Sequence, residues 1–277
     1  MSQSTFGMGR VALTVNDIAT VGDYYEKAIG LARLSRDGET ATYGAGDRVL
    51  LELRADPAAR RRSAREAGLF HTAFLLPARA DLGRYTRFLA ENRIPVVGAS
   101  DHAVSEAIYL TDPEGNGIEV YADRPAADWQ WKDGSVHMVT EALDIAGLVT
   151  AAGDSPWQGA PEGSVVGHVH LQVGALPPAE AFYHGLLGLD ITTHYPGATF
   201  YSAEGYHHHV ATNLWNSRGA GKRDFPSTGL AEMEIHLDPT RAAAIRARLP
   251  DGQAAGVDGA GLTLEDPWGT PIALKSL

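Results

Sequence analysis

Cysteine is absent from the 277 residues, which excludes disulfide bridges, iron–sulfur clusters, zinc–thiolate sites and a cysteine nucleophile. Any bound metal would have to be held by histidine, carboxylate or water, ligands that suit iron(II), manganese(II), nickel or zinc. Basic residues are also in the minority. The 23 lysines and arginines against 34 acidic residues give a net charge of −11, so nothing indicates binding to nucleic acid.

Long apolar runs are absent too. No segment is long and apolar enough to span a bilayer, and the first residues contain no cationic stretch followed by an apolar run. We therefore expect neither a membrane association nor a signal peptide. Hydrophobic residues make up 44% and charged residues 21%, as in soluble globular proteins. The composition and length predict a cytoplasmic protein of about two domains.

Four segments of the chain repeat one pattern: a strand with period-two alternation, an amphipathic helix, and closing strands. The opening strands are predicted at 10–15, 70–77, 168–173 and 231–237. The closing strands are predicted at 48–53, 117–123, 207–215 and 270–277. Segments two and four share a D-P-x-G turn, at 112–115 and 266–269, so the two halves of the chain repeat at nearly equal offsets.

This repeat predicts the domain organisation. We expect an N-terminal domain over residues 8–125, made of the first two segments, and a C-terminal domain over 166–277, made of the last two. Residues 126–165, which contain two prolines and five glycines, are predicted to be a linker that carries one short helix.

Several stretches carry a resemblance to a known family, namely FHTAFLLP, DHAVSEAIYLTDPEGNGIEVYADRP, GHVHLQV and GYHHHVATNLW. With them the chain resembles the vicinal oxygen chelate superfamily, which contains glyoxalases, bleomycin-resistance proteins and extradiol dioxygenases. Within it, the chain is similar to the four-module catechol 2,3-dioxygenases. The resemblance implies an α+β fold in which four βαβββ modules form two curved-sheet barrels.

In this superfamily the metal ligands come from the first and last strands of the modules and point into the cup of the sheet. The first-strand candidates are Arg10, His71, His168 and Glu232. The last-strand candidates are Glu52, Glu119, one histidine of 207–209, and Ala273. His170 shares a strand face with His168, so either histidine could be the inward one; the position after Gly167 matches the family's ligand and favours His168.

The way in which the modules pair decides which candidates meet. If module one pairs with two and three with four, the first cup holds His71 and Glu119 beside Arg10, a cation that repels a metal. If two pairs with three, one cup holds His71, Glu119 and His168, a 2-His-1-carboxylate set with open positions for substrate and oxygen. The other cup then has no histidine at these positions. We predict the second arrangement, although the sequence alone leaves both open.

The resemblance also implies catalytic residues around the metal. Three consecutive histidines are unusual in a strand, and we expect His209, with His207 as the alternate, to act as acid and base beside the metal. Tyr109 precedes Glu119 at the spacing of the extradiol catalytic tyrosine, and His102 is expected to line the same cup. Each also has an ordinary alternative as a structural histidine or a strand aromatic.

The activity implied by the resemblance is extradiol cleavage of catechol or a substituted catechol by O2, with Fe(II), or alternatively Mn(II), as the cofactor. The partners would be a small aromatic diol and O2, and the sequence leaves open whether subunits form a homo-oligomer. Two other functions stay open. One is a glyoxalase-type metal-dependent isomerase or lyase, and the other is a non-catalytic protein that sequesters a ligand, as bleomycin-resistance proteins do.

Overall fold

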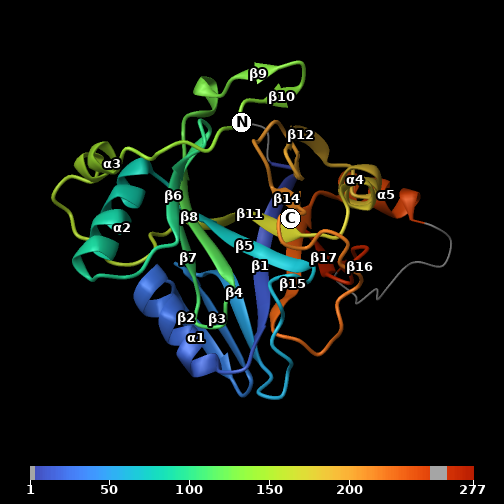
Figure 1. Cartoon of the computed structure of the whole chain (residues 1–277), viewed down its shortest axis with the longest axis horizontal. Coiled ribbons are helices and arrows are strands. Elements are labelled where there is room, and N and C mark those ends of the chain that lie inside the picture. The colour runs from blue at the N-terminus through green and yellow to red at the C-terminus, as the bar shows by residue number, and fades with distance from the viewer. Residues whose placement is uncertain (1–3, 250–260) are drawn as a thin grey trace.

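Two mixed β-sheets form the core of the computed structural model, which describes residues 4–249 and 261–277 (Figure 1). Part of the predicted C-terminal domain, residues 250–260, therefore lies outside the described residues. The seven-stranded sheet has the order β16 (Gly261–Glu265), β17 (Pro271–Ser276), β15 (Gly229–Leu237), β1 (Phe6–Val15), β4 (Arg48–Ala55), β3 (Thr40–Ala45) and β2 (Ala32–Asp37). The eight-stranded sheet has the order β12 (Asp190–Tyr195), β13 (Ala198–Ser202), β14 (Val210–Asn213), β11 (Val165–Gln172), β5 (Gly68–Leu75), β8 (Gly117–Asp123), β7 (Ser105–Thr111) and β6 (Gly98–Asp101).

Helices connect the strands of each module. They are α1 (Ile18–Tyr24), α2 (Arg79–Glu91), α4 (Leu176–Glu180) and α5 (Pro239–Arg248), of which α1 and α4 continue as π-helical turns over Tyr25–Ile29 and Ala181–Leu186. The predicted linker contains a 3-10 turn (Ala126–Asp128), a short hairpin of β9 (Trp131–Lys132) and β10 (Ser135–Val136), and the expected helix, α3 (Ile145–Ala151). Among the described residues no helix is long and apolar enough to cross a membrane.

The sheets show how the modules pair. In the seven-stranded sheet β1 of module one runs antiparallel to β15 of module four, and in the eight-stranded sheet β5 of module two runs antiparallel to β11 of module three. The predicted pairing of two with three and one with four is thus confirmed, as is the α+β fold. Each predicted domain range contributes one module to each sheet, and the division of the chain at 126–165 stays a prediction.

Strand alternation separates the two faces of the eight-stranded sheet. On β11, Val169 and Leu171 are buried in the hydrophobic core, whereas His168 and His170 lie on the opposite face. This sheet curls into a half-barrel whose middle is formed by β5 and β11 (Figure 1). One side contains β6 and β8, the other side contains β12 and β14, and the β9–β10 hairpin lies above. The curl makes the histidine-bearing face the inside of a cup.

One predicted strand has different bounds. The closing strand of module three begins at Val210, so the three histidines before it lie in the loop that follows β13. The chain turns there, with positive φ at Glu204 (59°) and Gly205 (72°), and the carbonyl of His207 accepts a hydrogen bond from Thr192 Oγ1 at 2.6 Å. The prediction that residues 207–209 belong to the strand is therefore wrong, and period-two alternation does not apply to them.

The crossed pairing of the modules has a consequence for fragments. A fragment of residues 1–125 would keep the pairs β1–β4 and β5–β8 but lose the antiparallel partners of β1 and β5, which are β15 and β11. Because it would expose two long unpaired strand edges, we expect it to aggregate or to lack a cooperative unfolding transition. Circular dichroism and size-exclusion chromatography of the fragment, alone and mixed with residues 126–277, check this. A monomeric fragment that unfolds cooperatively would contradict it.

Candidate metal centre and cavity

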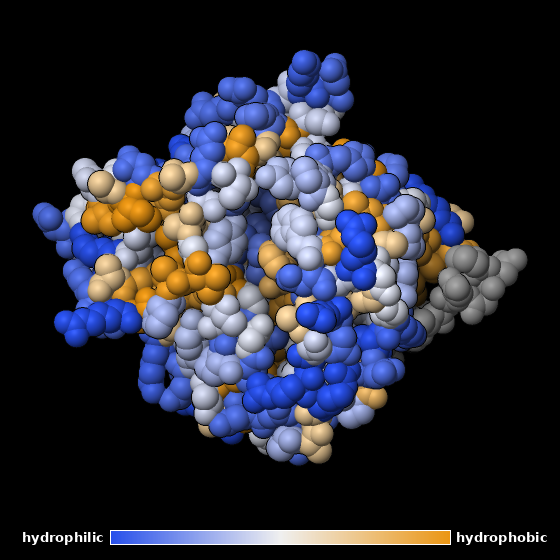
Figure 2. All heavy atoms as spheres, in the orientation of Figure 1, coloured by the Kyte–Doolittle hydropathy of each residue, from blue (hydrophilic) through white to orange (hydrophobic). Residues whose placement is uncertain are grey.

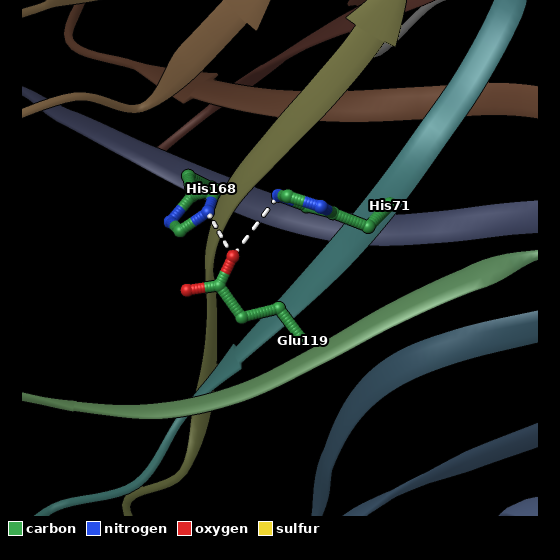
Figure 3. A group of neighbouring side chains, drawn as sticks. All are labelled: His71, Glu119 and His168. Atoms are coloured by element: carbon green, nitrogen blue, oxygen red, sulfur yellow. Dashed lines mark hydrogen bonds and ion pairs between the residues drawn. The ribbon is translucent and has the colours of Figure 1, made fainter. Parts of the chain in front are cut away.

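Three buried side chains converge inside the cup of the eight-stranded sheet (Figure 3). They are His71 from β5, Glu119 from β8 and His168 from β11, and one ligand atom of each lies within 4.8 Å of the others. Glu119 Oε2 lies 3.0 Å from His71 Nε2 and 3.2 Å from His168 Nε2. The structure thus brings together the three residues predicted to bind the metal.

The strand register explains why these side chains meet. Ala73 of β5 lies directly opposite His168 of β11 on one side and Glu119 of β8 on the other. Because the side chain between them is a single methyl group, His168 and Glu119 can lean over it and touch. The next residue of β5 on the same face is His71, which completes the group.

The electrostatics of the group follow from its burial. Burial by itself raises the pKa of Glu119, but the adjacent His168 and His71 outweigh it and hold the pKa well below its ordinary value. Burial lowers the pKa of His168 to about 4, and the attraction of Glu119 offsets only part of this. At neutral pH the group is thus a carboxylate beside a neutral histidine, the protonation states that metal coordination needs.

The donor atoms also fit a metal. His71 Nε2 is buried 3.0 Å from Glu119 and has no hydrogen-bond partner among the described residues. Buried polar nitrogens are costly to leave unpaired, and a bound cation would satisfy such lone pairs. Two neutral histidines and one carboxylate on one side of an ion leave adjacent positions free for other ligands.

A cavity of about 370 Å³ opens above the three residues. Figure 2 shows this face of the molecule hollowed near its centre, where the two sides of the curled sheet face each other. Met138, Val139 and Thr140, from the chain that follows the β9–β10 hairpin, close one side. The backbone of this segment bonds to the end of β6 and the loop after it, through hydrogen bonds of Glu141 with Asp101 and of Val139 with His102.

Tyr109 and His102 form a hydrogen-bonded pair in the wall of the cavity. His102 Nδ1 lies 2.6 Å from the carbonyl oxygen of Val139, which can only accept, so this nitrogen carries the hydrogen. In the neutral ring Nε2 then accepts from the Tyr109 hydroxyl at 2.6 Å. Burial and the nearby Glu119 carboxylate raise the pKa of Tyr109 well above its ordinary value, so the hydroxyl keeps its proton. Both residues line the cavity, as predicted.

The three consecutive histidines point in different directions. The His208 ring lines the cavity and lies 4.1 Å from the His168 ring, centroid to centroid. The His209 ring instead packs against Phe6 of β1 at 4.7 Å, and its Nδ1 accepts from Ser202 Oγ at 2.9 Å. The structure therefore brings His208 to the metal group and places His209 outside the cavity.

His207 lies behind His208 and orients it. Asp123 Oδ1 accepts a hydrogen bond from His207 Nε2 at 2.9 Å, so in the neutral ring Nδ1 of His207 is the acceptor. The Nδ1 of His208 donates to it at 2.8 Å, which leaves Nε2 of His208 without a hydrogen. Burial, together with neighbouring histidines such as His168 and His207, lowers the pKa of His208 well below its ordinary value. His208 is therefore a neutral base with a free lone pair.

The corresponding part of the seven-stranded sheet contains an ion-pair cluster. Arg10 lies 3.0 Å from Glu52 and 2.8 Å from Glu232, the carboxylates predicted to face this cup. Arg54 makes a further ion pair with Glu52 at 2.6 Å. Guanidinium groups thus neutralise the carboxylates here, where no metal is needed.

Comparison with known proteins identifies the family of the chain. Residues 7–120 match the model of the Glyoxalase/Bleomycin resistance protein/Dioxygenase superfamily. The chain is 43% identical over 228 residues, 80% of each chain, to catechol-2,3-dioxygenase of Bacillus subtilis (strain 168). The chain therefore belongs to the glyoxalase/bleomycin resistance protein/dioxygenase superfamily.

Two solved structures show the same fold at low identity. Glyoxalase I from Zea mays superposes with a TM-score of 0.58 at 15% identity, over 98% of this chain and 92% of that one. The cppA protein from Streptococcus pneumoniae TIGR4 superposes with a TM-score of 0.59 at 10% identity, over 98% of this chain and 100% of that one.

Sequence reasoning missed two kinds of cavity residue. His208 is not among the residues expected beside the metal, because residues 207–209 are predicted to belong to a strand; Gly205 is the sequence signal for the turn that the structure shows instead. The other kind lies in the predicted linker, where no sequence pattern indicates a cavity wall: Met138, Val139 and Thr140.

The metal group predicts a specific pattern of metal loss. His71→Ala, His168→Ala and Glu119→Gln should each weaken metal binding by more than about 100-fold, beyond the effect expected of residues that only support a ligand. Glu52→Gln, at the corresponding position of the other sheet, should leave binding unchanged. Metal content after gel filtration, measured by mass spectrometry, distinguishes these outcomes. Retention in His168→Ala together with loss in Glu52→Gln would refute the assigned site.

The buried histidines predict an acid-sensitive fold. Burial lowers the pKa of His168 to about 4 and that of His209 to about 3, whereas both would titrate near 6.5 in the unfolded chain. The unfolded state therefore binds more protons below this pH, and the unfolding free energy of metal-free protein should fall between about pH 6.5 and 4, by up to about 2 kcal/mol per histidine at pH 5.

Denaturant unfolding at several pH values measures this dependence. His209→Gln should reduce the slope between pH 6 and 5 by nearly one proton, because the variant lacks a histidine that is neutral in the fold and protonated in the unfolded chain. His194→Gln, whose side chain is 64% exposed, is the matched control and should leave the slope unchanged. Equal slopes in all three proteins would show that the fold does not hold His209 neutral.

Proposed function

We propose that this protein is an extradiol dioxygenase that cleaves catechol or a substituted catechol with O2, and that His71, Glu119 and His168 hold its iron(II), with manganese(II) as the alternative. The observation that carries the proposal is the buried pair of histidines and one carboxylate at the base of a cavity. This donor set with open positions is typical of non-haem iron(II) oxygenases. The similarity to the Bacillus subtilis catechol-2,3-dioxygenase supports the same reaction.

The bound ion would act as a Lewis acid toward the two neighbouring oxygens of the diol and would hold both reactants at adjacent positions. The remaining tasks fall to the protein. The diol has to lose protons as it binds, and the cavity has to exclude bulk water. The overall reaction breaks one ring carbon–carbon bond beside the diol and places both atoms of O2 in a 2-hydroxymuconic semialdehyde.

His208 is placed to take a proton from the diol. Its Nε2 carries a free lone pair because Nδ1 donates to His207, which Asp123 in turn orients. A neutral histidine beside the substrate is a competent general base, and once protonated it can return the proton as an acid later in the reaction. We therefore assign to His208 the role that the sequence assigned to His209 or His207.

Tyr109 and His102 are placed to serve the diol from another wall of the cavity. The Tyr109 oxygen can accept a hydrogen bond from a hydroxyl of the diol while its own proton is directed at His102 Nε2. If His102 takes up a proton, the same hydroxyl is released to donate toward the negative charge that develops on the ring oxygen. The Val139 carbonyl keeps His102 in the orientation that this exchange needs.

The first test is oxygen consumption by protein loaded anaerobically with iron(II) and then mixed with catechol and substituted catechols. We expect stoichiometric O2 uptake and a yellow ring-fission product. His208→Gln should lower kcat by about 10²- to 10⁴-fold with metal still bound, because it removes the general base. His209→Gln should stay within a few fold of the unchanged protein, since this ring packs against β1 outside the cavity.

Other outcomes would overturn the proposal. No O2 uptake across the panel, with iron demonstrably bound, would indicate a metal-dependent isomerase or lyase on the same fold. Failure to bind any divalent metal would indicate a ligand-sequestering protein. A large loss of turnover in His209→Gln, with none in His208→Gln, would restore the assignment made from the sequence. We expect the enzyme to work in the cytoplasm, and sedimentation would show whether it forms a homo-oligomer.

A further inference from the structure

A further histidine, His170, lines the cavity and has no role in the metal group. His170 lies on β11, on the same face as His168, and directly opposite the metal-binding His71 in the strand register. Its side chain is buried, with the whole residue 4% exposed. The proposed reaction makes no use of it.

The surroundings of His170 are aromatic. Its ring lies 5.0 Å from that of Phe70, 5.8 Å from that of Phe200 and 5.3 Å from that of Trp215. Trp215 is 46% exposed and lies at the rim of the cavity. His170 therefore lies between the metal group, 5.0 Å away at the His71 ring, and the rim. A substituent that extends from a bound ring toward the rim would pass beside it.

The protein leaves the imidazole of His170 unsatisfied. Its Nε2 is buried and has no hydrogen-bond partner among the described residues. A neutral imidazole has one donor and one acceptor nitrogen, and leaving a buried one unpaired is unfavourable. Because His170 lines the cavity, a ligand bound there can supply the missing hydrogen-bond partner.

The charges that line the cavity indicate whether the hydrogen-bond partner of His170 is charged or uncharged. Neither lysine nor arginine is among the described residues that line the cavity. Glu119 and an ionised diol would already balance a divalent cation, so a carboxylate on the ring would be buried without a counter-charge. No described residue bonds to the His170 ring and fixes its tautomer, so Nε2 can carry the hydrogen, and an uncharged oxygen substituent can accept a hydrogen bond from it without that penalty.

We infer that His170 determines specificity, and that it selects catechols that carry an uncharged, hydrogen-bond-accepting oxygen substituent over those with an alkyl or carboxylate group at the same position. This inference rests on the proposed function, since it takes a catechol as the ligand. The aromatic walls would contact the ring itself, and His170 would supply a directional contact for the substituent.

Matched pairs of ligands isolate this contact. Under nitrogen, calorimetry on the iron(II)-loaded protein gives the affinity for 3-methoxycatechol against 3-ethylcatechol, and for 4-methoxycatechol against 4-ethylcatechol. Each pair differs by one oxygen in place of a methylene. In one of the two pairs we expect the methoxy compound to bind about three- to tenfold more tightly, the range of a single net hydrogen bond. In the same assay the dihydroxybenzoate with its carboxylate at that position (2,3-dihydroxybenzoate for the 3-substituted pair, 3,4-dihydroxybenzoate for the 4-substituted pair) should bind more weakly than either member of that pair.

Variants at position 170 test whether the preference for the methoxy compound depends on His170. His170→Leu should remove it while iron and the ethyl compound still bind, and His170→Gln, which keeps a donor, should retain part of it. Phe70→Leu is the control in the aromatic wall and should weaken both members of the pair equally. A methoxy preference that is absent from the unchanged protein, or that survives in His170→Leu, would overturn the inference, and so would loss of iron in His170→Leu.

This experiment is separable from the test of the proposed function. It reads binding without O2, so it reports on His170 whether or not the ring is cleaved. If the protein binds catechols with the expected preference but consumes no O2, the dioxygenase assignment fails and the role of His170 stands. If O2 is consumed but the preference is the same in His170→Leu, the dioxygenase assignment stands and the role of His170 fails.

Discussion

The antiparallel pairing of β5 with β11 is the interaction on which the rest of the site depends. It sets His170 opposite His71 and His168 opposite Ala73, and the parallel pairing of β8 adds Glu119 beside Ala73. Because strand alternation has a period of two, a slip of one residue would turn these side chains into the hydrophobic core. The position of a metal site made from two halves of the chain is thus set by backbone hydrogen bonds along one pair of strands.

A second antiparallel pairing of the same kind joins β1 to β15, and the side chains beside it form ion pairs instead of a metal group. Arg10 takes the place of a histidine, and its guanidinium balances Glu52 and Glu232. An arginine inside the sheet keeps these carboxylates paired without a metal. The duplicated architecture therefore carries one catalytic cup and one that is structural, and the crossed pairing of the modules gathers the two metal-binding histidines on the same side.

Around the metal group, the cavity combines orienting hydrogen bonds with apolar walls. The Val139 carbonyl orients His102, and Asp123 orients His207 and through it His208. In both cases an oxygen that can only accept settles which ring nitrogen carries the hydrogen. His170 differs from these histidines, because its Nε2 has no hydrogen-bond partner among the described residues. The sites of chemistry are thus pre-oriented, and the unsatisfied group is left for the ligand.

The sequence by itself determined the four repeated modules, the α+β class and the candidate ligands on the first and last strands, because period-two alternation and residue type are local properties that do not depend on how the modules pair. It could not decide between the two module pairings, nor identify Met138 as part of the cavity, since both depend on contacts between segments far apart in the chain. The sequence also led us to expect His209 beside the metal group, whereas the folded chain places His208 there. Alternation holds only inside a strand, and the turn at Glu204 and Gly205 sets the direction of these histidines through backbone angles that only the folded chain fixes.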